Sequence, residues 1–238
     1  MTVKSPGQII SQVLSPAVRL WLRSQVDAIA ELEFQINGKN RQILRGYIPN
    51  VVLSAAKAVY QGLHFTRVQL QANNIRVNLG QVIKGQSLRL LEPIPVTGEV
   101  SLSQADLQAS LSSPLLSTAI KDLLSTLMAA SGKTQPQPSI QDWQLHWQEA
   151  VIAPNCLKLK GIVTNVDKNT IPIVLETQLN LANAHCLCLR HTEITASPLL
   201  NPVQLEQFDI DLGEAVNLDT LQLQSGEILV SGGVRVMP

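Results

Sequence analysis

A change of phase within one apolar pattern places the strongest constraint on how this chain can fold. The apolar residues before the change are Val68, Leu70 and Ala72, and those after it are Ile75 and Val77. Each set alternates with polar residues, as in a strand with one buried face, but the two sets are out of phase across Asn73-Asn74. A β-bulge there would add one residue, bend the strand and return the apolar side chains to one face. The pattern therefore predicts a long, bent strand with Arg67 and Arg76 on the same polar side.

Helical patterns with clear start signals lie on both sides of this strand. Ser-Pro pairs begin at Ser5, Ser15 and Ser113. Each pair is typical of an N-cap followed by proline in the first helical turn. Ser103 and Asp106 fit a capping box for a short helix, and a wide apolar stripe from Pro114 to about Ala130 is the strongest helical signal. The segment from Val51 to Tyr60 also reads as a short helix.

The second half of the chain reads almost entirely as strands. Residues 132–139 form a Gly- and Pro-containing connector, and beyond it apolar and polar residues alternate as far as a hairpin around Ser225-Gly226. We expect an α+β fold in which one long curved antiparallel sheet wraps against the N-terminal and central amphipathic helices. Neither half reads as a closed fold, so the expected organisation is a single domain over residues 1–238 with 133–139 as an internal connector.

Composition and charge narrow the possible partners. Apolar residues make up 45% of the chain but aromatic residues only 3%, so aliphatic side chains must fill the interior. Such an interior suits a plain β core, and it equally suits a cavity for acyl chains. Residues 1–102 carry 11 Lys/Arg and 5 Asp/Glu, whereas residues 103–238 carry 7 and 13. This asymmetry would orient the basic half toward an anionic membrane, although segregation onto solvated faces gives the same counts. Dispersed cations without aromatic platforms argue against nucleic acid.

The cysteines and the N-terminus bear on the cellular compartment. Three cysteines and no recognisable signal peptide argue against a disulfide framework, and no apolar run approaches the length of a bilayer-spanning helix. We therefore expect a cytoplasmic protein that can associate peripherally with a membrane.

A search for catalytic motifs favours a non-enzymatic protein. The sequence contains no G-x-S-x-G elbow, no Walker motif and no H-E-x-x-H pair. Cys186 and Cys188 share a strand face, but a zinc site would need further ligands there, so buried thiols are the simpler interpretation. Asp209 and Asp211 lie in an acidic run typical of a solvated edge. We expect no catalytic residues, no metal and no cofactor.

Several segments resemble a bacterial family described as LmeA-like phospholipid-binding proteins. The resemblance is carried by VLSPAVRLWLRSQVD, RQILRGYIPNVVLSA, AVYQGLH, NNIRVNLGQVIKGQSLRLLEPIPVTGEVSLS and ADLQASLSSPLL, within about residues 6–120. The family is similar in outline to tubular lipid-binding proteins, in which a long helix lies against a curved antiparallel sheet and acyl chains occupy the groove between them. The resemblance implies lipid binding rather than a catalytic step.

The leading hypothesis is therefore binding or transfer of a phospholipid or another acyl lipid in a groove between the bent strand and the helix Pro114–Ala130. The expected groove residues are Val68, Leu70, Ile75, Val77, Leu116, Ile120, Leu123 and Leu127. The candidates for contact with the phosphate headgroup are Arg67, Arg76, Lys84 and Arg89, because guanidinium and ammonium groups bind phosphate well. Two alternatives remain, a membrane-associated assembly adaptor that uses its sheet edges, and a lipid hydrolase with an unrecognised serine.

Overall fold

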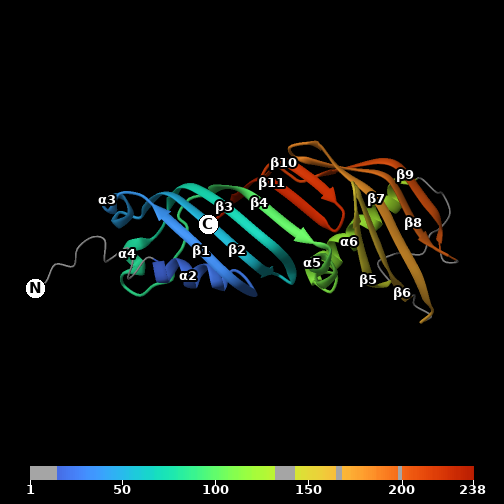
Figure 1. Ribbon diagram of the computed structural model, residues 1–238, viewed down its shortest axis with the longest axis horizontal. Coiled ribbons are helices and arrows are strands. Elements are labelled where there is room, and N and C mark those ends of the chain that lie inside the picture. The colour runs from blue at the N-terminus through green and yellow to red at the C-terminus, as the bar shows by residue number, and fades with distance from the viewer. Residues whose placement is uncertain (1–14, 132–142, 165–167, 198–199) are drawn as a thin grey trace, which may run out of the picture.

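The chain folds into two antiparallel sheets that lie one after the other along an elongated molecule (Figure 1). The computed structural model describes residues 15–131, 143–164, 168–197 and 200–238. The helices are α2 (Ser15–Ser24), α3 (Asn40–Leu44), α4 (Leu79–Val82), α5 (Gln104–Ser110) and α6 (Pro114–Ala130). The first sheet has the order β1-β2-β3-β4-β11-β10 and the second has the order β5-β6-β7-β8-β9.

The strands of each sheet are mostly consecutive in sequence. Those of the first sheet are β1 (Ala28–Asn37), β2 (Tyr47–Tyr60), β3 (Leu63–Arg76), β4 (Ile94–Ser103), β10 (Val216–Gln224) and β11 (Glu227–Val236). Those of the second are β5 (Gln144–Ala153), β6 (Cys156–Thr164), β7 (Thr170–Asn183), β8 (Cys186–Ala196) and β9 (Leu200–Asp211). The expectation of one continuous sheet is therefore wrong, because β5–β9 pair only among themselves and only the last hairpin returns to β4.

Each sheet has its own apolar core. In the first core, Val18 of α2 and Ile43 of α3 pack with Ile48, Ile75 and other residues of the sheet. The second core combines α5, α6 and the strands β5–β9. It also takes in Leu223 from the hairpin that belongs to the first sheet, so the two halves interlock.

The helix start signals at Ser103 and Ser113 are confirmed. The Ser103 side chain accepts a hydrogen bond from the Asp106 backbone N–H, and the Asp106 side chain accepts one from the Ser103 backbone, which completes the predicted capping box of α5. Ser113 caps α6 with Pro114 in its first turn. The Ser-Pro pair at Ser5 and the connector 133–139 lie outside the described residues. No helix in the described ranges is long and apolar enough to cross a membrane.

The phase change in β3 occurs where predicted, but by a different mechanism. The pairing of β3 with β2 keeps one register from Asn50↔Asn73 to Ile48↔Ile75, so β3 has no extra residue relative to β2. Instead, Asn74 adopts a left-handed conformation with φ of 55°. This conformation rotates the following side chains to the opposite side of the strand. Strand β2 shows a matching change between Ile48 and Val51, which both line the cavity although they are three residues apart. The β-bulge prediction is therefore wrong in its geometry.

The segment from Val51 to Tyr60 is part of β2 and not a helix. Ala55 and Ala58 are both buried although they are three residues apart, a spacing that suggests a helical face. The spacing arises because Lys57 between them has a φ of 50°. A left-handed residue thus changes the buried face within β2, as Asn74 does within β3, and gives β2 a helix-like spacing of buried residues.

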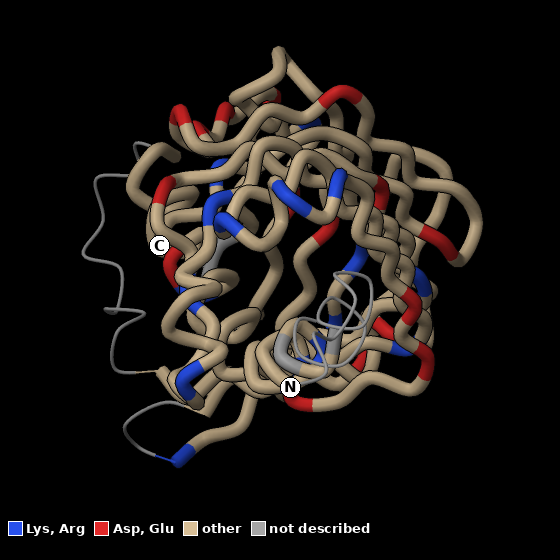
Figure 2. Tube along the Cα trace, turned by 90° about the vertical axis from the view of Figure 1, so that its left-hand side faces the viewer, with Lys and Arg blue, Asp and Glu red and all other residues tan. Residues whose placement is uncertain are grey.

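Glycines allow the first sheet to curl tightly beside β4. A Cβ on Gly98 would lie 2.0 Å from the Gln69 carbonyl oxygen, and one on Gly232 would lie 2.4 Å from that of Asn217. Gly98 and Gly232 are register partners in the pairing of β4 with β11. Viewed from the end that carries α3 and α4, the sheet forms an arch with α2 across its open side (Figure 2).

Candidate functional site

An apolar cavity of about 250 Å³ lies between α2 and the inner face of the first sheet. Its described lining consists of Val18, Trp21, Leu22, Ile48, Val51, Leu53, Leu70, Ala72, Ile75, Val77, Leu88, Leu90, Ile94, Val96, Val234 and Val236. Every one of these residues is apolar. The strands β2, β3, β4 and β11 contribute to the wall opposite α2.

Helix α2 forms one wall because its apolar residues gather on one side. Val18, Trp21 and Leu22 follow a spacing of three and four residues and face the sheet, whereas Leu20 points to solvent. The Arg19 guanidinium carbon lies 5.8 Å from the centre of the Phe34 ring on β1, a cation–π contact that ties the helix to the sheet edge.

A buried asparagine fixes the segment that forms the wall at the α4 end. Asn78 donates from Nδ2 to the Ser87 carbonyl oxygen at 2.9 Å, and its Oδ1 accepts from the Arg89 backbone N–H at 2.7 Å. These bonds hold the return segment after α4 so that Leu88 and Leu90 face the cavity. The Asn78 amide thereby holds that wall together with the backbone bond from the Leu91 N–H to the Arg76 carbonyl oxygen and the bridge between Val77 and Leu90.

The chemistry of this lining suits hydrocarbon and offers no means of acid–base or nucleophilic catalysis. The indole N–H of Trp21 is the only side-chain polar group among the lining residues. Apolar cavities of roughly 150 Å³ can take up a molecule such as benzene. A cavity of about 250 Å³ therefore has room for a segment of a flexible hydrocarbon chain.

The structure separates the eight predicted groove residues into two places. Leu70, Ile75 and Val77 line the cavity under α2. Val68 continues the same face of β3, half-buried and paired with Val100. The four residues from α6 do not reach this cavity, because α6 packs in the core of the second sheet.

The α6 residues lie beside the edge strand of the second sheet. Leu116, Ile120 and Leu123 form a shallow groove of about 570 Å³ together with Phe208 and Ile210 of β9. Three carboxylates, those of Asp122, Asp209 and Asp211, also line this groove. Leu127 is fully buried beneath it. The predicted pairing of the bent strand with α6 as two walls of one groove is therefore not what the fold builds.

Three of the four predicted phosphate ligands lie near the α4 end of the cavity. Arg76 Nε is 3.4 Å from Glu92 Oε1, and its guanidinium carbon lies 5.8 Å from the centre of the Tyr47 ring. Lys84 and Arg89 are exposed on the segment that follows α4. Arg67 is also exposed, but it precedes Arg76 by nine residues in β3, which corresponds to about 30 Å along a strand. One headgroup cannot contact both arginines.

Of the lining residues, sequence reasoning named only Leu70, Ile75 and Val77, and it missed those of α2, β2, β4, β11 and the segment after α4. The apolar stripe of α2 was visible in the sequence, but it is equally typical of a helix that simply packs on a sheet. The predicted last hairpin includes Val234 and Val236, but their place beside β4 depends on a pairing between segments more than 130 residues apart.

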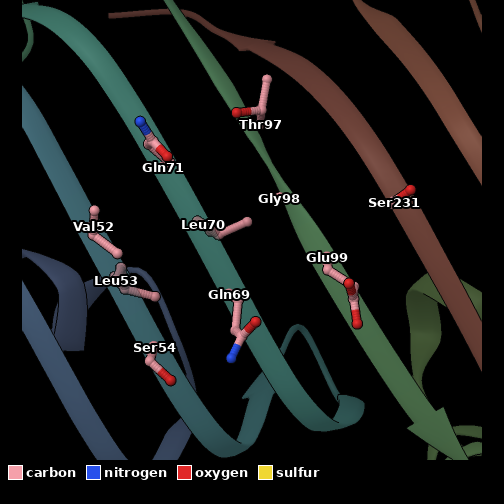
Figure 3. A pocket seen from close by; sticks show the side chains of 10 residues that line it. All are labelled: Val52, Leu53, Ser54, Gln69, Leu70, Gln71, Thr97, Gly98, Glu99 and Ser231. Atoms are coloured by element: carbon pink, nitrogen blue, oxygen red, sulfur yellow. The ribbon is translucent and has the colours of Figure 1, made fainter.

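The outer face of the same sheet carries an open hollow of about 450 Å³, which polar and apolar residues line together (Figure 3). Gln69 and Gln71 of β3 and Thr97 and Glu99 of β4 surround it, and the Leu70 side chain lies toward Gly98, which has none. The sheet thus separates this outer hollow from the apolar inner cavity.

Two thiols outside the cavity, those of Cys156 and Cys186, lie in surroundings that disfavour their ionisation. No group of His, Cys, Asp or Glu in the described residues is arranged to hold a metal ion. Burial, followed by the charge of Glu176, raises the pKa of the Cys156 thiol. Burial, followed by the charges of Asp209 and Asp211, raises the pKa of Cys186. Both thiols are thus less readily ionised than an ordinary cysteine.

Comparison with known proteins identifies one family. A family model described as LmeA-like phospholipid-binding matches residues 7–233, nearly the whole chain. No curated protein and no solved structure matches significantly.

Proposed function

The chain belongs to the LmeA-like phospholipid-binding family, and from this premise we propose that it binds a phospholipid in the cavity between α2 and the first sheet. An acyl chain would lie among the aliphatic side chains of β2, β3, β4 and β11. The observation that carries the proposal is the wholly apolar lining of the cavity. The protein would hold the lipid, or transfer it between membranes, without a chemical step.

The headgroup would lie toward the α4 end, where Arg76, Lys84 and Arg89 are exposed. Arg76 has the best surroundings for a phosphate, because Tyr47 supports its guanidinium. Its present partner, Glu92, is itself well exposed, and such an ion pair contributes little stability. A phosphate could therefore replace Glu92 at small cost. Arg67 would contact only a second anionic group near the other end of β3.

Native mass spectrometry of the purified protein tests the proposal directly. We expect a phospholipid to copurify, or to be taken up after incubation with liposomes. Ala72→Phe places a ring in the cavity and should reduce lipid occupancy at least several-fold. Gln71→Phe is the matched control, because the same ring then lies on the outer face of β3. No lipid in the unmodified protein, or equal occupancy in the two variants, would contradict the proposal.

Tryptophan fluorescence provides a second measurement. Trp21 lines the cavity, whereas Trp143 and Trp147 are buried in the other core. Lipid with brominated acyl chains should quench Trp21 while leaving the emission of the other two unchanged. In a Trp21→Phe variant the quenching should disappear. Residual quenching of the same size in that variant would place the lipid at the second sheet.

One observation favours the alternative of an assembly adaptor. Strand β9 is an edge of the second sheet and carries Glu206, Asp209 and Asp211, so its free backbone groups and its charge could receive a basic strand of another protein. This function requires no lipid. A protein free of lipid, with partners lost on charge reversal in β9, would favour it. Release of fatty acid or lysolipid in the liposome samples would instead favour a hydrolase.

A further inference from the structure

We propose that the end of the molecule formed by α3, α4, the segment 83–91 and the neighbouring face of α2 docks onto an anionic lipid bilayer. The inference rests on the proposed function, since it names the surface through which the lipid would enter and leave the cavity. It is carried by three exposed apolar side chains, by an excess of positive charge, and by the place of those side chains on or beside elements that also form walls of the cavity.

The exposed apolar side chains are Leu20, Ile83 and Leu91, whose exposed fractions are 73%, 54% and 57%. In water the apolar surface of these side chains stays unburied, and entry into a membrane would bury it favourably. Each belongs to an element that also contributes to the first core. Leu20 lies between the lining residues Val18 and Trp21, and Leu91 follows the lining residue Leu90.

The charge of this end matches an anionic surface. Between residues 39 and 98 the sequence contains eight Lys/Arg and a single acidic residue, Glu92. Six of the eight lie on or beside α3, α4 and segment 83–91, and they are Lys39, Arg41, Arg45, Arg76, Lys84 and Arg89. Within the described part of the chain, only Arg76 of these six forms an ion pair.

These charges gather at one end because a backbone hydrogen bond holds the segment after α3 beside the segment before α4. The Val77 backbone N–H donates to the Gly46 carbonyl oxygen at 2.9 Å, and Gly46 is the second residue after α3 while Val77 is the second before α4. Figure 1 shows α3 and α4 together at one extreme of the long axis, and Figure 2 looks onto this end. Cations and exposed aliphatic side chains at one tip are typical of interfacial membrane binding, whereas nucleic acid would offer no environment for Ile83 and Leu91.

Sedimentation with vesicles tests the charge component. The full chain should bind vesicles of phosphatidylcholine mixed with phosphatidylglycerol, bind phosphatidylcholine alone weakly, and be released by salt. Arg41→Glu with Arg45→Glu should weaken binding by at least about tenfold, because each cation near such a surface contributes roughly a factor of five. Lys168→Glu with Arg190→Glu is the matched control in the second half of the molecule. It changes the net charge equally and should leave binding within about twofold of the unmodified protein.

A second pair of variants tests the apolar component. Ile83→Ser with Leu91→Ser removes exposed side chains without disturbing the core, and should weaken vesicle binding several-fold. Leu115→Ser removes an exposed side chain of α6 and should leave vesicle binding unchanged. Equal binding by both charge variants, or vesicle binding that neither the charge pair nor the apolar pair affects, would overturn the proposal. Preference for a DNA duplex over the anionic vesicles would also overturn it.

Lipid occupancy measured on the same samples separates this inference from the proposed function. Copurifying lipid in a protein that fails to bind anionic vesicles would overturn the docking surface and leave the cavity proposal standing. Vesicle binding at this end by a protein that never carries lipid would support the docking surface and overturn the cavity proposal.

Discussion

At the scale of single residues, Asn74 shows how one backbone angle determines which side chains face the cavity. Its φ of 55° lies in the left-handed region that asparagine and glycine tolerate and β-branched residues avoid. Its side chain also accepts a hydrogen bond from the Tyr47 hydroxyl at 2.6 Å. Without the left-handed angle, Ile75 and Val77 would turn to solvent.

We predict that Asn74→Val is less stable than Asn74→Gly by about 1–2 kcal/mol, the cost of a left-handed conformation for a residue with a Cβ. Both variants lose the bond to Tyr47, so their difference isolates the backbone angle. Strand propensity alone predicts the opposite order, since valine favours strands and glycine does not. Urea denaturation of the two variants decides between these orders, and a more stable valine variant would show that β3 is regular at this point.

Asp106 provides a residue-scale prediction about pH. Burial raises the pKa of its carboxyl group, but hydrogen bonds from Ser103 and Thr66 outweigh burial and leave the pKa below its ordinary value. Because the pKa is lower in the folded state, the carboxylate stabilises the fold at pH values above its unfolded-state pKa. This stabilisation is lost as the pH falls through the folded-state pKa.

Asp106→Ala should therefore cost about 1 kcal/mol near neutral pH, a typical value for a helix cap, and progressively less in acid. The measurement is the urea midpoint of the variant and of the unmodified protein, taken from neutral pH to below the ordinary carboxyl pKa. The difference between the two midpoints at each pH gives the cost of the substitution. Asp219→Ala, an exposed aspartate on β10, serves as the control with a small, flat difference. A constant cost for Asp106→Ala at every pH would show that the charge of this carboxylate is not involved.

At the scale of elements, helices with local start signals could be predicted from the sequence. The left-handed residues that change the buried face of a strand could not. Ser113-Pro114 and the Ser103–Asp106 capping box lie within a few residues of the helices that they start, so sequence alone locates α5 and α6. In β2, by contrast, the left-handed residue Lys57 places Ala55 and Ala58 on one face and imitates a helix. Which sheet a helix covers also depends on tertiary packing, and this is why α6 was assigned to β3 although α2 lies there.

The docking of α2 can be tested within that helix. Val18→Ser with Leu22→Ser removes two side chains from the cavity wall, and should lower the free energy of unfolding by roughly 2–4 kcal/mol through lost apolar burial. It should also shift the emission of Trp21 to longer wavelength as the helix leaves the sheet. Leu20→Ser, a neighbouring change on the exposed side, should alter neither measurement. An equally large effect of Leu20→Ser would place the other face of α2 against the sheet.

At the scale of the whole molecule, the return of the last hairpin joins the two sheets. Strand β11 pairs with β4 along its whole length, from Glu227↔Ser103 to Val236↔Ile94. Leu223 of β10 meanwhile lies in the core of α6 and the second sheet. The sequence indicated this hairpin by its turn at Ser225-Gly226, but not its place in the sheet, because nothing in its local pattern specifies β4 as its neighbour.

This interlock predicts that the two halves unfold together. Ile43 and Leu127 are both almost completely buried, one in each core. Replacing either by alanine should cost about 2–5 kcal/mol. Because β10 and β11 contribute to both halves, both variants should lower the midpoint of one shared transition in calorimetry, with equal calorimetric and van't Hoff enthalpies. Two transitions, each lowered by only one of the variants, would mean that the sheets are independent domains. In that case the cavity under α2 could be studied without the second sheet. A single transition would instead couple the proposed lipid binding in the cavity to packing in the second sheet.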